Sequence, residues 1–449
     1  MGHATRFRAD RPGARAIRRS VQNLALNEKR FLSLLSELVK LGPKLANSPS
    51  AGLVPEEKLA ADRVLSVLSP HVAAGKLRAE LLSAPGHESR PNLVLTLPGK
   101  GSGVVGFVGA HFDVVPADRV GEGWVRDPWS LEVEGGVLYG RGVTDCLGHV
   151  ALLTDLLAEL CERGVTPERS VKVVLISNEE EAPIPEIGLD WAFSVGALDD
   201  LAKGTVYWLD SADFGPTVGT GGMAMWKLEA TGVGGHSGFT QNCVNALELA
   251  FAAERALVEW FEQRFPAHPD EARWGFLSPS SLKATRMLVP NDKVTKIPAL
   301  ASIEGDIRLT PFYDMQDAIE GARAFVAALD RRIEAGDPPR GFPRTRAVSG
   351  ERGCVRLEPM GRSMEGIACR LDSPGLRALE RALCVARPGV DPKAYSMTGS
   401  LPLVRDLQRR GFDVQITGFG RSGYYHAPNE QAELEHFRQG YRILVELLG

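Results

Sequence analysis

Apolar positions along the chain follow two spacings, one typical of buried strands and one typical of amphipathic helices. Short, almost uninterrupted apolar runs predict strands that are covered on both faces. These runs are 92–97, 104–110, 171–177, 206–209 and 413–417. Helical spacing predicts helices near 28–41, 56–68, 148–163, 376–385 and 401–410. The alternation predicts an α/β fold with a central sheet flanked by helices. The first helix is expected to begin after Asn27, its N-cap, and to end at Gly42-Pro43.

The pattern changes at Thr220-Gly221-Gly222. From Met223 onward the order of elements is strand, helix, strand, strand, helix, strand, which is typical of a small α+β domain inserted into a larger one. A turn-rich stretch over 336–353 follows, and the α/β pattern then resumes. We therefore expect a disordered tail over 1–25, a large domain formed by 26–222 and 361–449, and an inserted domain over 223–360.

Composition excludes some classes of protein. The chain has 449 residues, a charged content of 24% and a formal net charge of −4, so nothing in it indicates nucleic acid or an anionic membrane as a partner. No apolar run approaches the ~20 residues that span a bilayer. The six cysteines form no C-x-x-C pair, and the arginine-rich N-terminus lacks the apolar region of a secretory signal. We expect reduced thiols and a cytoplasmic protein.

Acidic and imidazole side chains follow several of the predicted strands. His111 and Asp113 come after 104–110, Glu179 and Glu180 after 171–177, Asp210 after 206–209 and His426 after 413–417, while Asp145 precedes a predicted helix. Open α/β sheets build their sites at the carboxyl ends of their strands, so these groups are expected to converge. Zinc accepts both imidazole nitrogen and carboxylate oxygen, and a catalytic zinc site leaves a position open for water.

Each of these pieces has an ordinary structural explanation when it is taken alone. An isolated His-x-Asp is usually a satisfied polar pair, and an acidic run such as Glu179-Glu180-Glu181 is usually a solvated face or a helix start. Several carboxylates in one place, however, are opposed by like-charge repulsion and desolvation unless cations are present. We therefore predict two divalent metal ions. Zinc is the first candidate, and the type of ligand alone does not distinguish it from cobalt or manganese. Asp113, two residues after His111 on an extended chain, is predicted to orient that imidazole.

Six segments together resemble the dinuclear zinc amidohydrolase and metallopeptidase family, which includes acetylornithine deacetylases, succinyl-diaminopimelate desuccinylases, aminoacylases and carboxypeptidases. They are 109–116 (GAHFDVVP), 139–148 (YGRGVTDCLG), 177–181 (SNEEE), 234–238 (GGHSG), 305–308 (GDIR) and 425–427 (YHA), in the order of the family. Segments 144–149, 207–213, 218–223, 308–314 and 398–406 resemble the plant-type acetylornithine deacetylases more closely still. The resemblance implies a zinc-exopeptidase-like catalytic domain with a mixed central sheet, plus a ferredoxin-like inserted domain that serves as lid and dimerisation domain.

The resemblance also implies a role for each candidate residue around the metal ions. The implied ligands are His111, Asp145 and Asp210 for one ion and Asp145, Glu180 and His426 for the other, so that Asp145 bridges the two. Glu179 is the implied general base, which takes a proton from the attacking water and hands it to the departing amine.

Residues of the inserted domain and the loop 398–400 are implied to bind the substrate. His236 is the implied oxyanion donor, reaching into the site of a partner subunit, which implies a homodimer through the inserted domain; its alternative is a histidine that caps a helix. Arg308 is the implied ligand of the substrate's α-carboxylate, its alternative being a surface ion pair, and Asn245 is a weaker candidate for the same task. Thr398, Gly399 and Ser400 either close the carboxylate pocket or form a plain turn.

The activity implied is metal-dependent hydrolysis of an N-acyl amino acid, first of all Nα-acetyl-L-ornithine to L-ornithine and acetate, a step of arginine biosynthesis. An aminoacylase or a dipeptidase or carboxypeptidase of the same family is the alternative within this chemistry. The wider family has a lysine and a glycine where this chain has Leu147 and His149. That departure motivates a further alternative, a non-catalytic relative that acts as a binding protein. Cys146 and His149 are expected to pack against the site without binding metal.

Overall fold

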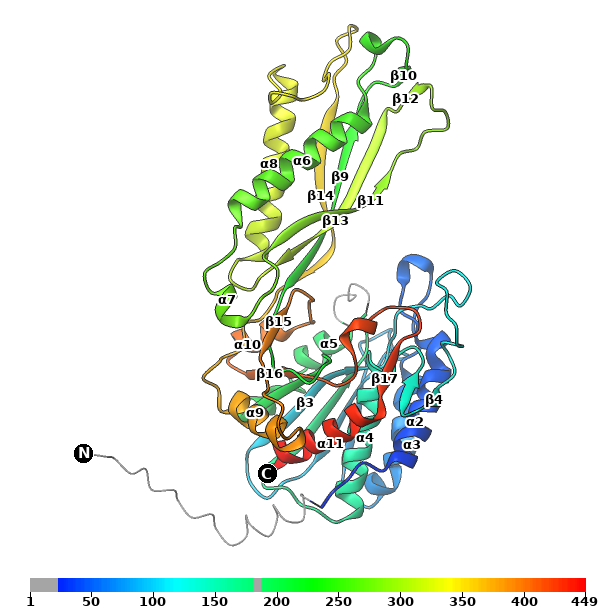
Figure 1. Ribbon diagram of the computed structural model, residues 1–449, viewed down its shortest axis with the longest axis vertical. Helices are drawn as coiled ribbons and strands as arrows, with labels where there is room; N and C mark the ends of the chain where they lie inside the picture. The colour runs from blue at the N-terminus through cyan, green and yellow to red at the C-terminus, as the bar shows by residue number, and fades with distance from the viewer. Residues whose placement is uncertain (1–22, 181–186) are drawn as a thin grey trace, which may run out of the picture. The chain divides into compact units, whose positions relative to one another are not determined.

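The computed structural model describes residues 23–180 and 187–449, so most of the tail expected to be disordered, and Glu181, lie outside the described residues. Two compact units make up the chain (Figure 1). The larger unit contains the chain up to Val218, Cys369–Ala394 and Asp406–Gly449, and the smaller unit contains Gly219–Ala368 and Tyr395–Arg405. The domain boundaries drawn from the sequence stay a prediction. Within the described ranges, no helix combines the length and the apolar character needed to cross a bilayer.

An eight-stranded mixed sheet confirms the predicted α/β architecture. Across the sheet the strands are β1 (Arg78–Leu82), β2 (Asn92–Leu97), β6 (Ser170–Ile176), β3 (Val104–His111), β7 (Gly204–Leu209), β16 (Asp413–Thr417), β8 (Thr217–Thr220) and β15 (Tyr395–Met397). β3 runs parallel to β6 and to β7, and β7 runs parallel to β16, whereas β2 is antiparallel to β1 and β6. The carboxyl ends of the four parallel strands therefore meet at one edge of the sheet.

Helices and short strands surround this sheet. The helices are α2 (Glu28–Leu45), α3 (Lys58–Ala73), α4 (Leu147–Glu162), α5 (Leu189–Ser194), α9 (Pro374–Ala386), α10 (Val404–Arg409) and α11 (Leu434–Leu448). A small antiparallel sheet of β17 (Gln431–Glu433), β5 (Val137–Tyr139) and β4 (Glu132–Glu134) lies in the larger unit. Helix α4 is buried along nearly its whole length because α2, α3 and α11 pack around it.

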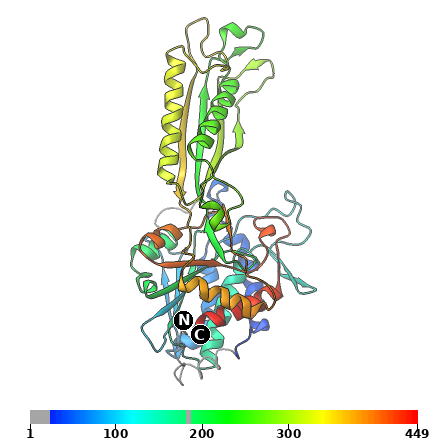
Figure 2. The ribbon, with the colours of Figure 1, turned by 60° about the vertical axis from the view of Figure 1, so that its left-hand side comes forward.

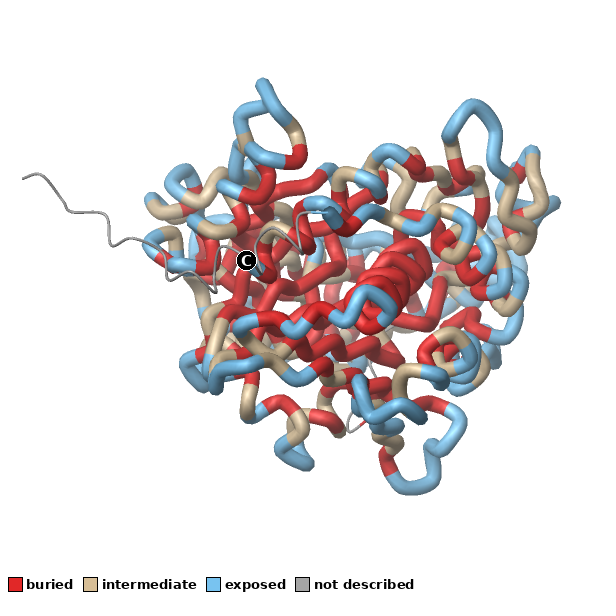
Figure 3. Tube along the Cα trace, turned by 90° about the horizontal axis from the view of Figure 1, so that it is seen from below, coloured by how far each residue is buried: buried red, intermediate tan, exposed pale blue. Residues whose placement is uncertain are grey.

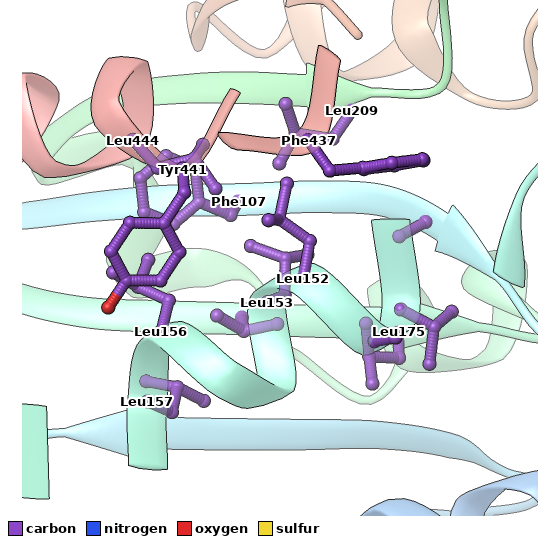
Figure 4. Close-up of a cluster of buried hydrophobic side chains, with 14 of the residues drawn as sticks. Phe107, Leu152, Leu153, Leu156, Leu157, Leu175, Leu209, Phe437, Tyr441 and Leu444 are labelled. Atoms are coloured by element: carbon purple, nitrogen blue, oxygen red, sulfur yellow. The ribbon is translucent and has the colours of Figure 1, made fainter. Parts of the chain in front are cut away.

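Both faces of the sheet are covered, as the continuous apolar strands predicted. On β3, Phe107 packs into the hydrophobic core that includes Leu152 of α4 and Phe437 of α11 (Figure 4). The preceding residue, Gly106, faces Leu201 of the 3-10 helix η2 (Asp199–Lys203) on the opposite side. Figure 3 shows that buried segments fill the interior and exposed loops lie at the rim. This rigid frame positions the ends of β3, β6 and β7.

Helix α2 differs from its prediction at its C-terminal end. Asn27 is the N-cap as expected, since its side chain accepts a hydrogen bond from the backbone N–H of Arg30. The helix nevertheless continues through Gly42 and Pro43. Gly42 is required for packing instead, because a Cβ there would lie 2.1 Å from the ring of Trp129. Tertiary packing thus overrides the local stop signal.

The smaller unit is an α+β domain whose order of elements confirms the prediction. Its antiparallel sheet has the order β11 (Ser281–Leu288), β13 (Leu300–Leu309), β9 (Gly222–Thr231), β14 (Cys354–Met364). The long helices α6 (Ala246–Arg264) and α8 (Met315–Glu334) cover one face of this sheet (Figure 2). Burial alternates along β9, as expected for a sheet with a single covered face. Short elements complete the unit: β10 (Gly235–His236), β12 (Lys296–Ile297) and α7 (Glu271–Trp274).

Candidate metal centre

The five predicted metal ligands converge on one place in the larger unit. Nε2 of His111 lies 3.0 Å from Oδ1 of Asp145 and 3.8 Å from Oδ1 of Asp210. Nε2 of His426 lies 3.2 Å from Oδ2 of Asp145 and 2.9 Å from Oε2 of Glu180. The two groups share Asp145, which offers a different oxygen to each. Two imidazoles and three carboxylates therefore form two adjoining sets of donors.

The sheet explains this convergence. His111 is the last residue of β3, Asp210 directly follows β7, and Glu179 and Glu180 follow β6 closely. These three strands are neighbours and run parallel, so their carboxyl ends lie side by side at the edge where α/β sheets carry their sites. Asp145 lies just before α4, and His426 lies on the loop after β16.

Asp113 supports two parts of the site. Nδ1 of His111 lies 2.9 Å from the backbone oxygen of Asp113 and 3.6 Å from its Oδ1, so this residue orients the imidazole and turns Nε2 toward the other ligands. Oδ2 of Asp113 also accepts the backbone N–H groups of Glu179 at 2.9 Å and Glu180 at 3.0 Å. Asn47 donates to the same oxygen at 2.7 Å. The spacing of His111 and Asp113 predicted a contact with the carboxylate, whereas the shorter contact is to the backbone oxygen of Asp113. No pattern in the sequence pointed to Asn47.

Several carboxyl groups lie close together in this site, and their arrangement favours the binding of cations. Burial, and then the charge of Asp145, raises the pKa of Glu180 to about 7. Burial likewise raises the pKa of Asp210 to about 7, with Asp145 contributing and His111 opposing. Oε1 of Glu180 is buried and has no hydrogen-bond partner within residues 23–180 and 187–449. Divalent cations would stabilise the ionised carboxylates and give that oxygen a partner.

Glu179 lies beside the ligand sets without belonging to either of them. Its Oε2 is 4.0 Å from Nε2 of His111, and its side chain is 12% exposed. Burial raises the pKa of Glu179 well above its usual range, and the charge of Asp210 raises it further, while His111 lowers it. A carboxyl group with a raised pKa beside a cation site is suited to accept and return a proton.

Cys146 and His149, which were expected to pack against the site, lie next to the predicted ligands. Nε2 of the buried His149 accepts the backbone N–H of Phe419 at 2.8 Å, and Nδ1 lies 3.4 Å from Sγ of Cys146. His149 is thus engaged on both nitrogens and is absent from the ligand groups. Sγ of Cys146 comes closer than the sequence suggested, within 4.8 Å of ligand atoms of His111, Asp145 and Asp210. Burial raises the pKa of the Cys146 thiol, which favours its neutral form.

The predicted substrate residues of the smaller unit fall into two groups. Arg308 pairs with Met223 across the strands, next to Leu309 and Gly222, and its Nε lies 2.6 Å from Oδ2 of Asp306. The loop of Thr398, Gly399 and Ser400 lies near this end, since Gly399 O accepts the N–H of Gly221 at 2.9 Å.

His236 and Asn245 form the second group, at the opposite end of the same sheet. His236 lies in β10, beyond the Thr231 end of β9, and Figure 1 shows β10 and β12 at that end. Nδ1 of the exposed His236 accepts the N–H of Gly238 at 3.0 Å. Asn245 is the N-cap of α6, and its Oδ1 accepts the N–H of Leu247. The length of β13 separates this group from Arg308 by about 25 Å at ~3.3 Å per residue.

Known proteins are similar to this chain in sequence and in fold. The model of peptidase family M20/M25/M40 matches residues 107–449. The chain is 38% identical to acetylornithine deacetylase of Arabidopsis thaliana, over 95% of this chain and 96% of that protein. It is 40% identical to acetylornithine deacetylase of Dictyostelium discoideum, over 94% of this chain and 97% of that protein. The structure of human carnosine dipeptidase 1 shares the fold, with a TM-score of 0.70 at 17% identity over 97% of this chain and 98% of that one.

Proposed function

The chain belongs to peptidase family M20/M25/M40, and from this premise we propose that it hydrolyses Nα-acetyl-L-ornithine to L-ornithine and acetate. It is a metal-dependent amidohydrolase similar to the acetylornithine deacetylases. The observation that carries the substrate assignment is the identity of 38% and 40% to such enzymes over nearly the whole chain. The fold alone does not distinguish this substrate, because a carnosine dipeptidase has the same fold. The cytoplasmic setting stays a prediction.

The donor set supports two bound divalent ions. His111 and Asp210 would hold one ion, Glu180 and His426 the other, and Asp145 both. When bound, such ions polarise an amide carbonyl and make a water molecule more acidic. Zinc suits imidazole with carboxylate, and cobalt or manganese accepts the same donors.

Glu179 is the proposed general base of the reaction. Its carboxyl group is held beside the ligands, because Asp113 fixes the backbone N–H groups of Glu179 and Glu180. The raised pKa of Glu179 makes its carboxylate a stronger base toward water. The same carboxyl then returns that proton to the nitrogen that leaves as the amine of ornithine.

Arg308 is the proposed partner of the substrate's α-carboxylate. A guanidinium group binds a carboxylate through two parallel N–H donors. Asp306 holds Arg308 at 2.6 Å and keeps the side chain in place at this end of the sheet. Thr398, Gly399 and Ser400, near the same end, are proposed to close the carboxylate pocket.

His236 is proposed to act in the site of a second copy of the chain. Arg308 and His236 lie at opposite ends of one sheet, so one chain does not bring both to one small substrate. In a homodimer formed through the inserted domain, His236 of one chain would reach the site of the other chain. Asn245 lies at the same end of the sheet as His236 and is proposed to enter that site with it. The edge strand β11 supports such an interface, because Met287 and Leu288 are exposed on it and an edge strand carries unpaired backbone groups.

A substrate panel tests the proposal. The purified, zinc-loaded protein is assayed with Nα-acetyl-L-ornithine, N-acetyl-L-methionine and a dipeptide, and the Glu179→Gln variant serves as a control for contaminating hydrolases. We expect the highest kcat/KM with acetylornithine and the loss of that activity in the variant. A higher kcat/KM with acetylmethionine or the dipeptide would contradict the substrate assignment while leaving the amidohydrolase assignment in place.

A further inference from the structure

A buried ion pair lies directly behind the metal ligands. Nη1 of Arg141 is 2.8 Å from Oε2 of Glu430, and the two side chains are 1% and 0% exposed. The pair joins positions 289 residues apart in the sequence. Burying two opposite charges is unfavourable unless further hydrogen bonds satisfy the remaining donors and acceptors. The further hydrogen bonds of Arg141 and Glu430 identify the segments that this ion pair connects.

Glu430 collects backbone N–H groups from the segment that carries Asp145. Its Oε2 also accepts the N–H of Gly142 at 3.0 Å. Its Oε1 accepts the N–H of Thr144 at 2.8 Å and the N–H of Asp145 at 3.0 Å. With Arg141, four N–H donors surround one carboxylate. The segment 142–145, which ends at the shared ligand, is thus fastened at three backbone N–H groups.

The same pair contacts the loop that carries His426. Glu430 lies four residues after His426, and Nη2 of Arg141 is 3.5 Å from the backbone oxygen of His426. Thr144 adds a contact to this segment, because its Oγ1 donates to the backbone oxygen of Gln431 at 2.9 Å. His426 has φ +55°, a backbone region that residues other than glycine adopt only when their surroundings hold them there.

We propose that Arg141 and Glu430 are positioning residues that hold the shared ligand Asp145 and its neighbour His426 in the positions required for metal binding. The pair contacts the backbones of both ligands and takes no part in either ligand group. Outer partners of this kind commonly govern metal affinity. The inference rests on the metal-dependent part of the proposed function and is independent of the substrate.

A second ion pair, with a buried carboxylate and a partly exposed arginine, provides a control. Asp155 has a side chain that is 0% exposed and lies 2.6 Å from Nε of Arg30. It accepts the backbone N–H of Asn27 at 3.0 Å and so joins the start of α2 to α4. Like Glu430, it is a buried carboxylate with an arginine and a backbone donor. Its hydrogen-bond partners within residues 23–180 and 187–449, Asn27 and Arg30, are not among the predicted metal ligands.

The experiment is a titration of the metal-free protein with Co²⁺ alone. Wild type, Glu430→Gln and Asp155→Asn are followed by the visible absorption of bound Co²⁺ and by competition with a chelator. Glutamine preserves the size of Glu430 but places an amide nitrogen against N–H donors. We expect Glu430→Gln to bind Co²⁺ about 10- to 100-fold more weakly, with an altered spectrum. Asp155→Asn is expected to lower the Tm but to keep the wild-type affinity and spectrum.

Wild-type affinity and spectrum in Glu430→Gln would overturn the inference, and so would an equal weakening in Asp155→Asn. Should Glu430→Gln fail to fold, Arg141→Lys decides, because lysine keeps a cation beside Glu430 and loses the second arm that reaches His426. Weaker Co²⁺ binding by this variant supports the inference, and unchanged binding overturns it. No substrate is present, so a wrong substrate assignment leaves the result intact. A wild-type protein that binds no Co²⁺ overturns both this inference and the proposed metal chemistry.

Discussion

The two carboxylate oxygens of Asp145 face different imidazoles, with Oδ1 at 3.0 Å from Nε2 of His111 and Oδ2 at 3.2 Å from Nε2 of His426. One side chain therefore belongs to two sets of donors. Each set offers one imidazole and two carboxylates, a composition suited to a divalent ion with a position left for water, and Sγ of Cys146 lies beside the set of His111.

Replacing Asp145 is expected to affect both ions at once. Asp145→Asn keeps the shape of the side chain but removes its charge and one of its acceptor oxygens. Asp210→Asn, by contrast, alters one set alone. We expect two ions per chain in wild type, about one in Asp210→Asn and fewer than one in Asp145→Asn, with turnover of the last reduced by about 10²–10⁴. Metal analysis after gel filtration measures this, and two retained ions in Asp145→Asn would show that it does not bridge.

Two inactive variants are expected to restore activity when they are combined. Glu179→Gln removes the base and His236→Ala the proposed donor from the partner. In a mixed dimer, one site keeps Glu179 of one chain and His236 of the other. Mixing equal amounts after dissociation and reassociation should recover about a quarter of the wild-type activity, because half of the dimers are mixed and each has one intact site. Mixtures no more active than the separate variants would place His236 outside the partner's site.

Stability in acid is expected to depend on His149. Burial lowers the pKa of His149 to about 4. Between pH 4 and about 6.5, the unfolded chain binds a proton that the folded protein does not, so the free energy of unfolding falls as the pH falls through this window. The shift corresponds to about 3 kcal/mol.

The matched variant is His149→Gln, which lacks this titration. Urea unfolding of both metal-free proteins between pH 4 and 7.5 measures the difference. The variant is expected to be less stable at pH 7.5 by about 1–3 kcal/mol, because the buried ring and its contacts are lost. The difference in the free energy of unfolding between the two proteins should become smaller as the pH falls, because only the wild type loses stability through the titration of His149. A constant difference would mean that His149 titrates alike in the folded and unfolded states.

Gly42 is expected to be needed for packing, despite its place in a helix. Gly42→Ala should raise the intrinsic helix propensity by ~1 kcal/mol. The added methyl group would meet the ring of Trp129, however, and such overpacking costs about 1–3 kcal/mol. We expect a lower Tm for Gly42→Ala and an unchanged or higher Tm for Ser33→Ala, an exposed position of the same helix. Stabilisation by Gly42→Ala would contradict the close packing.

Much of the frame follows from the sequence because burial is periodic. The apolar runs at 104–110, 171–177 and 206–209 became β3, β6 and β7, since a strand covered on both faces must be apolar at every position. His111 and Asp210 come directly after their runs and Glu180 lies three residues after its run, so all three lie at the ends of these strands. Once neighbouring parallel strands are expected, their ends are expected to meet.

Only the tertiary structure decided which distant groups meet as partners. The Asp113 carboxylate fixes the backbone of Glu179 and Glu180, Glu430 fixes that of Asp145, and Arg308 and His236 lie at opposite ends of one sheet. Periodicity reports how deeply a position is buried and which local hydrogen bonds it makes. It does not report the partner of a buried carboxylate, because that depends on how segments far apart in the chain come together, as Arg141 and Glu430 do across 289 positions.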